Sequence, residues 1–356
     1  MSHPTDTNPT RARIAVVFGG RSSEHGVSCL TAREVLAVID NDRYDVQPIG
    51  ITLTGNWVAE TAQWPEIAVG TLPSVREDRP PVTWESLREF DVVFPLIHGP
   101  WGEDGTIQGL FEMADVRYVG AGVLASSVGM DKPFTKTVFS AAGLPQVPYV
   151  TVLPGQWDQE HDRTEARIKA LRLPVFVKPA RAGSSSGITM VEHVEDLDMA
   201  IRTAMKFDPK VIVEAFARGK RELECGVMQQ PDGTPIASVV GEIKVAPSSD
   251  HEFYDFESKY IDGTGLNIVP AEISETLSER IRTYAVQAFE AVGCEGLARV
   301  DFFDTDDGLV INEINTMPGF TPFSMFPLLW EASGVPYAEL VERLIKLALN
   351  RDTGLR

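Results

Sequence analysis

The stretch "LVINEINTMPGF" (Leu309–Phe320) begins as an apolar run typical of a buried β-strand and then places polar side chains in the same run. These are Asn312, Glu313 and Asn315. A buried polar group is costly unless it is paired, hydrogen-bonded or bound to a metal ion. Alternate residues of a strand point to one face, so Glu313 and Asn315 project together. This strand therefore predicts a polar site on one face of a sheet.

The strand just before it carries a second carboxylate. "LARVDFFD" contains Asp301, and the short turn "TDDG" predicts that the two strands form a hairpin. Arg299 lies two residues before Asp301 and shares its face. Two carboxylates and an amide oxygen on one face form a hard oxygen site suited to Mg²⁺ or Mn²⁺. Together with the positive charge of Arg299, these ligands indicate a site for a metal-bound phosphate. The alternative is a hairpin with solvated polar residues.

The composition excludes several classes of protein. The chain has 356 residues, enough for two or three domains, and a net charge of −19 that argues against nucleic acid or an anionic membrane as partner. Its three cysteines are far apart and form no CxxC pair, which excludes a cysteine zinc site and fits a reducing cytoplasm. The polar segment Met1 to Arg13 lacks the apolar stretch of a secretory signal, so we expect a short disordered lead.

The order of the expected elements divides the chain into three parts. Strands separated by helices or loops predict a parallel α/β domain over residues 12–130, with ligands beyond the carboxyl ends of its strands. Those ends carry "GGRSSE", "HGPWGEDG" and "GAG". A second block spans residues 131–220, and longer strands with amphipathic helices follow over residues 221–356. The pattern predicts a mixed α/β and α+β fold.

A Gly/Ser loop follows a buried strand that ends at Lys178 in "VFVKPARAGSSSG". The loop, Gly183 to Gly187, is rich in backbone N–H and hydroxyl donors, and with the lysine it forms a phosphate-binding combination. It is not a Walker A motif, and a flexible surface linker is the alternative. Further on, Glu214 ends a strand and Glu222 follows eight residues later. These carboxylates could hold an adenine amino group or a ribose, or remain solvated charges.

Taken together, these parts resemble the ATP-grasp superfamily and, more finely, the D-alanine–D-alanine ligase family. The motifs that carry the resemblance stand in that family's order and at about its spacing: "GGRSSEHGVS", "HGPWGEDG", "MDK", "KPARAGSSSG", "FYDFESKY", "GLARVDFF" and "NEINTMPGFTPFSMFP". The resemblance covers the chain from Arg13 onward. It implies an N-terminal substrate-binding domain followed by two ATP-grasp subdomains that clamp ATP, the second of which carries the metal site.

The resemblance implies an ATP-dependent enzyme that joins two D-alanines through a D-alanyl phosphate, for a peptidoglycan precursor. Its cofactors would be ATP and two Mg²⁺ (or Mn²⁺), and its partners D-alanine and ATP, with no nucleic acid and no membrane. We expect a homodimer in the cytoplasm. The implied metal ligands are Asp301, Glu313 and Asn315.

The other implied site residues form three groups. The catalytic group is Glu24, Ser184, Tyr260, Arg299 and Gly319. The substrate-binding group is His98, Ser324 and Met325. The nucleotide-binding group is Lys132, Lys178, Ser185, Glu214, Ala215, Ala217, Glu222, Phe253 and Lys259.

Within the catalytic group, Glu24 would pair with the ammonium of the first D-alanine, and Ser184 and Tyr260 would orient it. The Gly319 N–H and Arg299 would face the developing oxyanion, since a glycine permits close approach of the backbone. His98 would lie near the first substrate, or would be a structural histidine at the end of a strand.

The chain departs from the family pattern at two positions. "GKRE" is one residue longer before Glu222 than the usual spacing, which weakens the assignment of Glu222 to the ribose. Met325 replaces the commoner leucine, a change of similar volume.

Other functions remain open from the sequence. A D-alanine–D-lactate or D-alanine–D-serine ligase is the nearest alternative, although "ESKY" with Tyr260 resembles the dipeptide-forming members. A non-catalytic ATP-binding regulatory protein belongs to another class, and an inactive relative would be expected to lose some of the metal and arginine residues. "GAGVLA" imitates a dinucleotide fingerprint but lacks the acidic partner about 20 residues later, so we predict a tight turn there.

Overall fold

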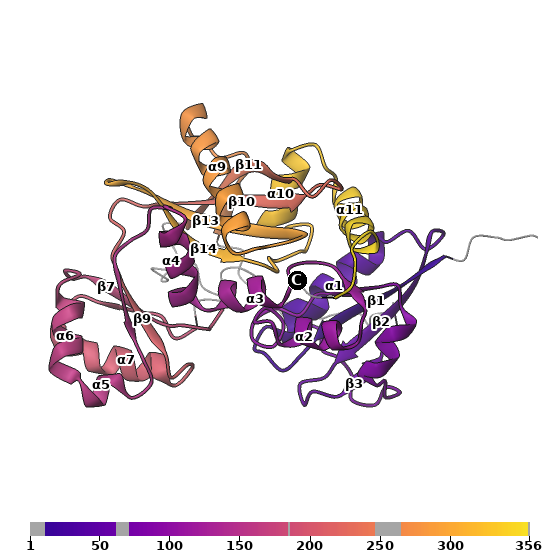
Figure 1. The fold of residues 1–356 in the computed structure, drawn as a ribbon, viewed down its shortest axis with the longest axis horizontal. Coiled ribbons are helices and arrows are strands. Elements are labelled where there is room, and N and C mark those ends of the chain that lie inside the picture. The colour runs from indigo at the N-terminus through magenta and orange to yellow at the C-terminus, as the bar shows by residue number, and fades with distance from the viewer. Residues whose placement is uncertain (1–10, 62–70, 184–185, 246–264, 355–356) are drawn as a thin grey trace, which may run out of the picture.

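The computed structural model describes residues 11–61, 71–183, 186–245 and 265–354, which form three sheets with helices around them (Figure 1). The strands are β1 (Ala12–Gly19), β2 (Tyr44–Ile51), β3 (Trp57–Ala59), β4 (Val92–Pro95), β5 (Arg117–Tyr118), β6 (Tyr149–Val152), β7 (Val175–Pro179), β8 (Thr189–Val191), β9 (Val211–Ala215), β10 (Arg221–Gln229), β11 (Pro235–Val245), β12 (Gly265–Ile268), β13 (Leu297–Thr305) and β14 (Gly308–Asn315).

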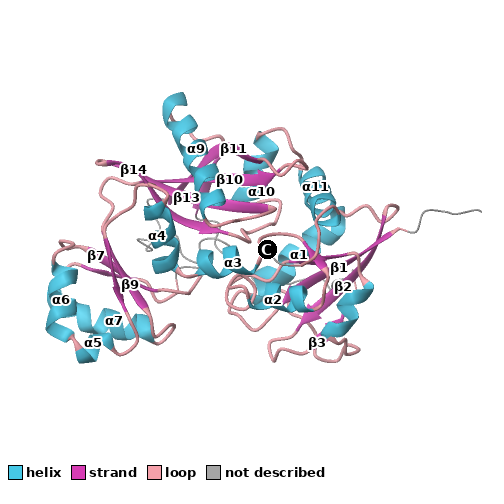
Figure 2. Cartoon of the chain, in the orientation of Figure 1, coloured by secondary structure: helices cyan, strands magenta, loops and turns pink. Residues whose placement is uncertain are grey.

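The α-helices, drawn in cyan in Figure 2, are α1 (His25–Val38), α2 (Thr106–Met113), α3 (Val123–Met130), α4 (Lys132–Ala141), α5 (Gln156–Gln159), α6 (His161–Lys169), α7 (Leu197–Met205), α9 (Glu275–Ala291), α10 (Met325–Ala332) and α11 (Tyr337–Leu349). Two 3₁₀ helices in the described ranges are η1 (Trp84–Glu89) and η2 (Val194–Asp196). None of these helices is long and apolar enough to span a bilayer.

The N-terminal sheet has the strand order β3-β2-β1-β4-β5. β1 is parallel to β2 and β4, and β4 is parallel to β5, whereas β3 adds an antiparallel edge that the sequence did not predict. Both faces are buried, because α1 and α11 cover one and α2 covers the other. The carboxyl ends of β1 and β4 therefore meet at one edge, which brings the turn with Glu24 next to His98.

The central sheet is antiparallel, in the order β6-β9-β7-β8. The apolar faces of α6 and α7 and the indole of Trp157 in α5 pack against it. These three helices lie together at the left of the view in Figure 1. α4 precedes this sheet in the chain, yet its Phe139 packs into the core of the C-terminal sheet, so α4 joins the two.

The C-terminal sheet is antiparallel, in the order β12-β11-β10-β13-β14. Alternate residues of β10 such as Leu223 and Cys225 pack against α9 in a buried core. The residues between them point the other way, toward α10 and a cavity. The predicted hairpin is confirmed, because β13 and β14 pair from Arg299 opposite Asn315 to Thr305 opposite Gly308.

The last helix returns to the N-terminal sheet. Leu340, Leu344 and Ile345 of α11 lie in the same core as Val16 of β1 and Val92 of β4. The predicted mixed α/β fold is thus confirmed, with the chain end covering a face of the first sheet. The division at residues 130 and 220 stays a prediction.

Candidate active site

One cavity of about 710 Å³ is lined by residues from the ends or faces of all three sheets. It is lined by every predicted site residue that lies in the described ranges, namely Glu24, His98, Lys132, Lys178, Glu214, Ala215, Ala217, Glu222, Arg299, Asp301, Glu313, Asn315, Gly319, Ser324 and Met325. Five further predictions lie outside the described residues: Ser184, Ser185, Phe253, Lys259 and Tyr260. The roles of all of these residues stay predictions.

The β13–β14 hairpin forms the acidic wall of the cavity. Asp301 stands directly opposite Glu313, and Arg299 stands opposite Asn315, so the four side chains share one face. The register shifts between Asp301 and Phe302, a β-bulge that changes the direction of the strand beside the site. The Asp301 and Glu313 side chains are 14% and 31% exposed, which leaves the second open to a ligand in the cavity.

Arg299 offsets part of the negative charge of this wall. Its Nε and Nη2 donate to the two oxygens of Asp301, both at 2.7 Å, and its Nε lies 2.8 Å from Oε2 of Glu224. Burial by itself would lower the pKa of Arg299, but the charges of Asp301 and Glu224 outweigh it and raise the pKa well above its usual value. The guanidinium is therefore a fixed positive charge in the cavity.

The predicted metal ligands fit a hard divalent cation by their chemistry, since they offer two carboxylates and one amide oxygen. Asn315 now donates its Nδ2 to Oδ2 of Asp301 at 3.0 Å, so its amide would turn to present the oxygen to an ion. Within the described ranges no three His, Cys, Asp or Glu side chains gather as a metal cluster.

The nucleotide end of the cavity is built around Glu214 at the end of β9. Its two oxygens lie 2.7 Å from Nζ of Lys136 and 2.6 Å from Nζ of Lys178. Burial would raise the pKa of Glu214, but the two lysines hold that pKa well below its usual range. Glu222 pairs with Lys220 at 2.6 Å. Two lysines around one carboxylate leave a net positive charge there, which suits phosphate.

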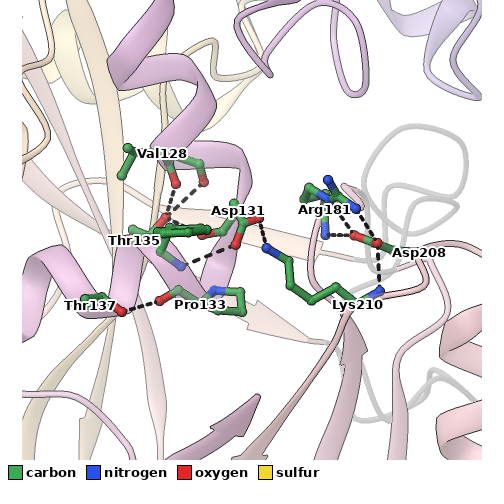
Figure 3. A network of polar contacts seen from close by, with 10 residues as sticks. Val128, Asp131, Pro133, Thr135, Thr137, Arg181, Asp208 and Lys210 are labelled. Carbon is green, nitrogen blue, oxygen red and sulfur yellow. Dashed lines mark hydrogen bonds and ion pairs between the residues drawn. The ribbon is translucent and has the colours of Figure 1, made fainter. Parts of the chain in front are cut away.

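A network of ion pairs joins Asp131, the residue before Lys132 at the start of α4, to the segments with Arg181, Asp208 and Lys210 (Figure 3). Asp131 caps α4 by accepting the Phe134 N–H at 3.3 Å, and its other oxygen pairs with Lys210. Arg181 donates from Nε and Nη2 to the Asp208 carboxylate at 2.9 and 2.8 Å. Lys132, next to Asp131 in the chain, donates its Nζ to the Ala182 carbonyl at 3.0 Å and lies 3.7 Å from Glu313. The network thus fixes both Lys132 and the start of the Gly/Ser loop.

Glu24 lies just before α1 and is only 8% exposed. The Ser22 hydroxyl accepts the Glu24 N–H at 3.2 Å and donates to the His98 carbonyl at 2.8 Å, which ties this turn to the end of β4. A Cβ on Gly183 would stand 2.6 Å from Oε1 of Glu24. The glycine therefore allows the loop after β7 to approach Glu24, next to the predicted Ser184.

His98 joins the N-terminal turn to the loop after β14. Its Nδ1 lies 3.2 Å from the Met317 carbonyl and its Nε2 lies 3.3 Å from the Thr31 hydroxyl. Burial lowers the pKa of His98, although the charge of Glu24 opposes the shift. A neutral ring that donates from Nδ1 and accepts from the Thr31 hydroxyl satisfies both contacts. His98 thus positions the loop that carries Gly319.

The loop after β14 continues into α10. Ser324 precedes the helix, which begins at Met325. The Ser324 hydroxyl accepts the Thr321 N–H at 3.1 Å and lies 2.8 Å from the Thr321 hydroxyl. This closed turn holds Ser324 and Met325 at the wall of the cavity.

Sequence reasoning assigned no role to two acidic residues of the cavity, Glu103 and Glu224. Glu103 lies in the quoted "HGPWGEDG" motif, and Glu224 alternates with Glu222 in "RELECG", so a signal existed for each. Oε1 of Glu103 accepts the Gly99 N–H at 2.7 Å. Burial and the nearby charge of Glu24 raise the pKa of Glu103 to about 8.

This shift predicts a pH effect on stability. Because the folded pKa is about 8 against an ordinary 4.5, the folded state keeps a proton that the unfolded state releases between these values. Wild-type stability therefore falls as the pH rises from about 5 to 8. Glu103→Gln has no such proton to lose. The difference between its Tm and the Tm of wild type should therefore increase by a few degrees as the pH rises from about 5 to 8. Thermal melts at several pH values test it, with the exposed Glu331→Gln on α10 as control. A Tm difference that does not change with pH would contradict it.

Two family models match the chain, described as D-ala D-ala ligase N-terminus over residues 13–121 and D-ala D-ala ligase C-terminus over residues 138–346. The chain is 52% identical over 380 residues to a D-alanine–D-alanine ligase of Arthrobacter sp., covering 100% of this chain and 99% of that one. It is also 52% identical over 380 residues to a D-alanine–D-alanine ligase of Streptomyces avermitilis, covering 98% of this chain and 97% of that one.

Two solved structures have the same fold over nearly the whole chain. A D-Ala:D-Ser ligase, VanG, from Enterococcus faecalis matches with a TM-score of 0.79 and 32% identity, covering 95% of this chain and 99% of that one. A D-alanine–D-alanine ligase from Coxiella burnetii matches with a TM-score of 0.74 and 33% identity, covering 96% of this chain and 94% of that one. By its sequence and its fold, the chain belongs to the D-alanine–D-alanine ligase family.

Proposed function

We propose that this protein is an ATP-dependent ligase that joins two D-alanines into D-alanyl-D-alanine for peptidoglycan precursor synthesis. One observation carries the proposal: the residues predicted for the amino acid, the phosphates and the metal come from distant parts of the chain and line one cavity. The identity of 52% to D-alanine–D-alanine ligases supports this substrate pair. A D-Ala:D-Ser ligase resembles the fold at 32% identity, so D-serine is the second candidate acceptor.

The proposed reaction has two steps. The carboxylate of the first D-alanine attacks the γ-phosphorus of ATP, which forms a D-alanyl phosphate and releases ADP. The amine of the second D-alanine then attacks the acyl carbon and loses a proton, and phosphate leaves with the carboxylate oxygen. Neither step needs a nucleophile from the protein, so the residues act by positioning and by charge stabilisation.

Each wall of the cavity has a proposed role. Glu24 binds the ammonium of the first D-alanine, and Lys132 and Lys178 bind phosphates. Arg299 and the Gly319 N–H stabilise the oxyanion that develops at the acyl carbon. Ser324 and Met325 contact the carboxylate of the second D-alanine. Asp301, Glu313 and Asn315 hold two Mg²⁺ or Mn²⁺, which when bound neutralise the charge that develops on the phosphates.

Phosphate release from ATP tests this proposal. D-alanine alone should release phosphate and give a dipeptide, whereas L-alanine should not. D-lactate or D-serine together with D-alanine should give little mixed product if the acceptor is D-alanine. Mixed product in excess of the dipeptide would assign the other acceptor, and no D-alanine-dependent phosphate would contradict the proposed ligase activity.

Glu24→Gln should raise the KM for the first D-alanine by roughly ten-fold or more. The physical reason is the loss of a charge-assisted hydrogen bond to the ammonium, on the order of 1.5–3 kcal/mol. ATP affinity should barely change, because Glu24 lies in the turn between β1 and α1, whereas Lys132 and Lys178 belong to α4 and β7. Glu34→Gln, on the helix that follows Glu24, is the control. A weakened ATP affinity with an unchanged KM for D-alanine would contradict the proposal that Glu24 binds the first D-alanine.

We also propose a homodimer located in the cytoplasm. Exposed Met113 at the end of α2 and Leu124 at the start of α3 offer an apolar surface, and α2 contacts α3. Three buried free thiols, Cys29, Cys225 and Cys294, suit a reducing compartment. Light scattering of the purified protein measures the oligomeric state.

A further inference from the structure

Glu224 of β10 lies beside Arg299 in the cavity wall and is 5% exposed. It stands directly opposite Asp301 in the β10–β13 ladder, so the two carboxylates lie on the same face and both contact the guanidinium. We propose that Glu224 is a positioning residue that keeps Arg299 in place when Asp301 binds a metal ion. This inference rests on the proposed function, because it concerns the arginine that acts in the ligase reaction.

The contacts of Asp301 show why a second carboxylate is needed. Its Oδ1 accepts from Arg299 at 2.7 Å, and its Oδ2 accepts from Arg299 at 2.7 Å and from Asn315 at 3.0 Å. A carboxylate offers about four lone-pair sites, and these bonds occupy most of them. A metal ion on Asp301 would therefore displace part of its bonding to Arg299.

The guanidinium would then lose part of its charge compensation in a place where solvent gives little help. The Arg299 side chain is 15% exposed, and an unpaired buried charge is strongly unfavourable. Glu224 supplies a carboxylate outside the predicted metal set, 2.8 Å from Nε of Arg299. Arg299 can thus stay beside the Gly319 loop while Asp301 turns toward the ion. Without the charge of Glu224, Arg299 would compete with the metal for Asp301.

A purely structural ion pair is the simpler interpretation, and the same sheet contains a matched example. Glu242 of β11 is 2% exposed and accepts from Nε and Nη2 of Arg221 at 2.9 and 2.7 Å. Glu242 stands opposite Leu223 of β10. Leu223 is next to Glu224 in the strand and points to the other face of the sheet, so Glu242 faces away from Asp301. Glu242→Gln therefore removes a buried charge from an arginine pair without touching the proposed mechanism.

The first experiment compares Glu224→Gln with Glu242→Gln. Mn²⁺ titrated in the presence of ADP measures metal affinity, and saturating ATP and D-alanine measure kcat. Glu224→Gln should weaken Mn²⁺ affinity and lower kcat by about 10-fold to 100-fold each, the usual effect of removing a residue that orients a metal ligand. Glu242→Gln should change only Tm. Equal metal affinity and kcat in the two variants would overturn the inference.

Chemical rescue tests positioning directly. Arg299→Ala should regain part of its activity when guanidinium chloride is added at low concentration, because Glu224 still binds the ion. The double variant Arg299→Ala/Glu224→Gln should not regain activity, whereas Arg299→Ala/Glu242→Gln should. Rescue that is independent of Glu224 would overturn the inference.

If Glu224→Gln does not fold, Arg299→Lys provides the second test. A lysine ammonium lacks the planar fork by which Arg299 holds both oxygens of Asp301 while it contacts Glu224. Arg299→Lys should therefore weaken Mn²⁺ affinity in the presence of ADP, and an unchanged affinity would overturn the inference. The Mn²⁺ titrations need no turnover, so they separate this inference from a failure of the proposed ligase activity, which wild-type phosphate release measures.

Discussion

Glu313→Gln is expected to lower kcat by more than about 100-fold while the fold is retained. Glu313 lies opposite Asp301 in the hairpin and is the more exposed of the two carboxylates, at 31% against 14%. In the proposed site Glu313 would be shared by both cations, so one neutral amide would weaken two metal positions at once. Glutamine keeps the size of the side chain, which separates the loss of charge from a change in packing.

Steady-state kinetics over a range of Mg²⁺ concentrations measure this effect. Asp307→Asn, in the exposed turn of the same hairpin, is the control and should keep wild-type turnover. Circular dichroism and Tm verify that each variant is folded. Near-normal turnover of Glu313→Gln at saturating Mg²⁺ would contradict the assignment of the metal site.

Arg299→Ala is expected to lower kcat by about 10²–10³-fold, the usual effect of losing one donor to an oxyanion. The variant also leaves Asp301 and Glu224 without the charge that both contact, so a lower Tm is expected as well. The loss should appear in kcat rather than in the KM for ATP, because the proposed contact forms at the acyl carbon.

Arg221→Ala is the matched control for the loss of stability. Arg221 also pairs through two nitrogens with a buried glutamate, Glu242, but that pair faces away from Asp301. It should lower Tm without lowering kcat once the protein is folded at the assay temperature. If Arg299→Ala and Arg221→Ala have the same kcat, the proposal that Arg299 stabilises the oxyanion is contradicted.

The metal-site hairpin could be predicted from the sequence because strand periodicity is local. Alternation placed Glu313 and Asn315 on one face, and the turn "TDDG" indicated the hairpin. The pairing of Asp301 with Glu313 also depends on the register shift between Asp301 and Phe302, which the sequence did not predict. The same local reasoning placed Lys178 at the end of a buried strand, which is β7. These expectations needed only residues a few positions apart.

The features that could not be predicted depend on contacts between distant parts of the chain. Nothing local to α11 indicates that it covers β1 and β4, which lie far away in the sequence. The raised pKa of Glu103 arises from burial and from Glu24, a residue of another element. Glu224 is one polar position in a strand, and its role depends on the register that pairs it with Asp301.

Isotope transfer from D-alanine to phosphate tests the proposed activity most directly. In the proposed reaction a carboxylate oxygen of the first D-alanine becomes bonded to the γ-phosphorus and leaves with the phosphate. D-alanine labelled with ¹⁸O in its carboxylate should therefore give inorganic phosphate that carries one labelled oxygen, together with unlabelled ADP. Phosphate without the label, released at the rate of dipeptide formation, would contradict a D-alanyl phosphate intermediate and the ligase mechanism built on it.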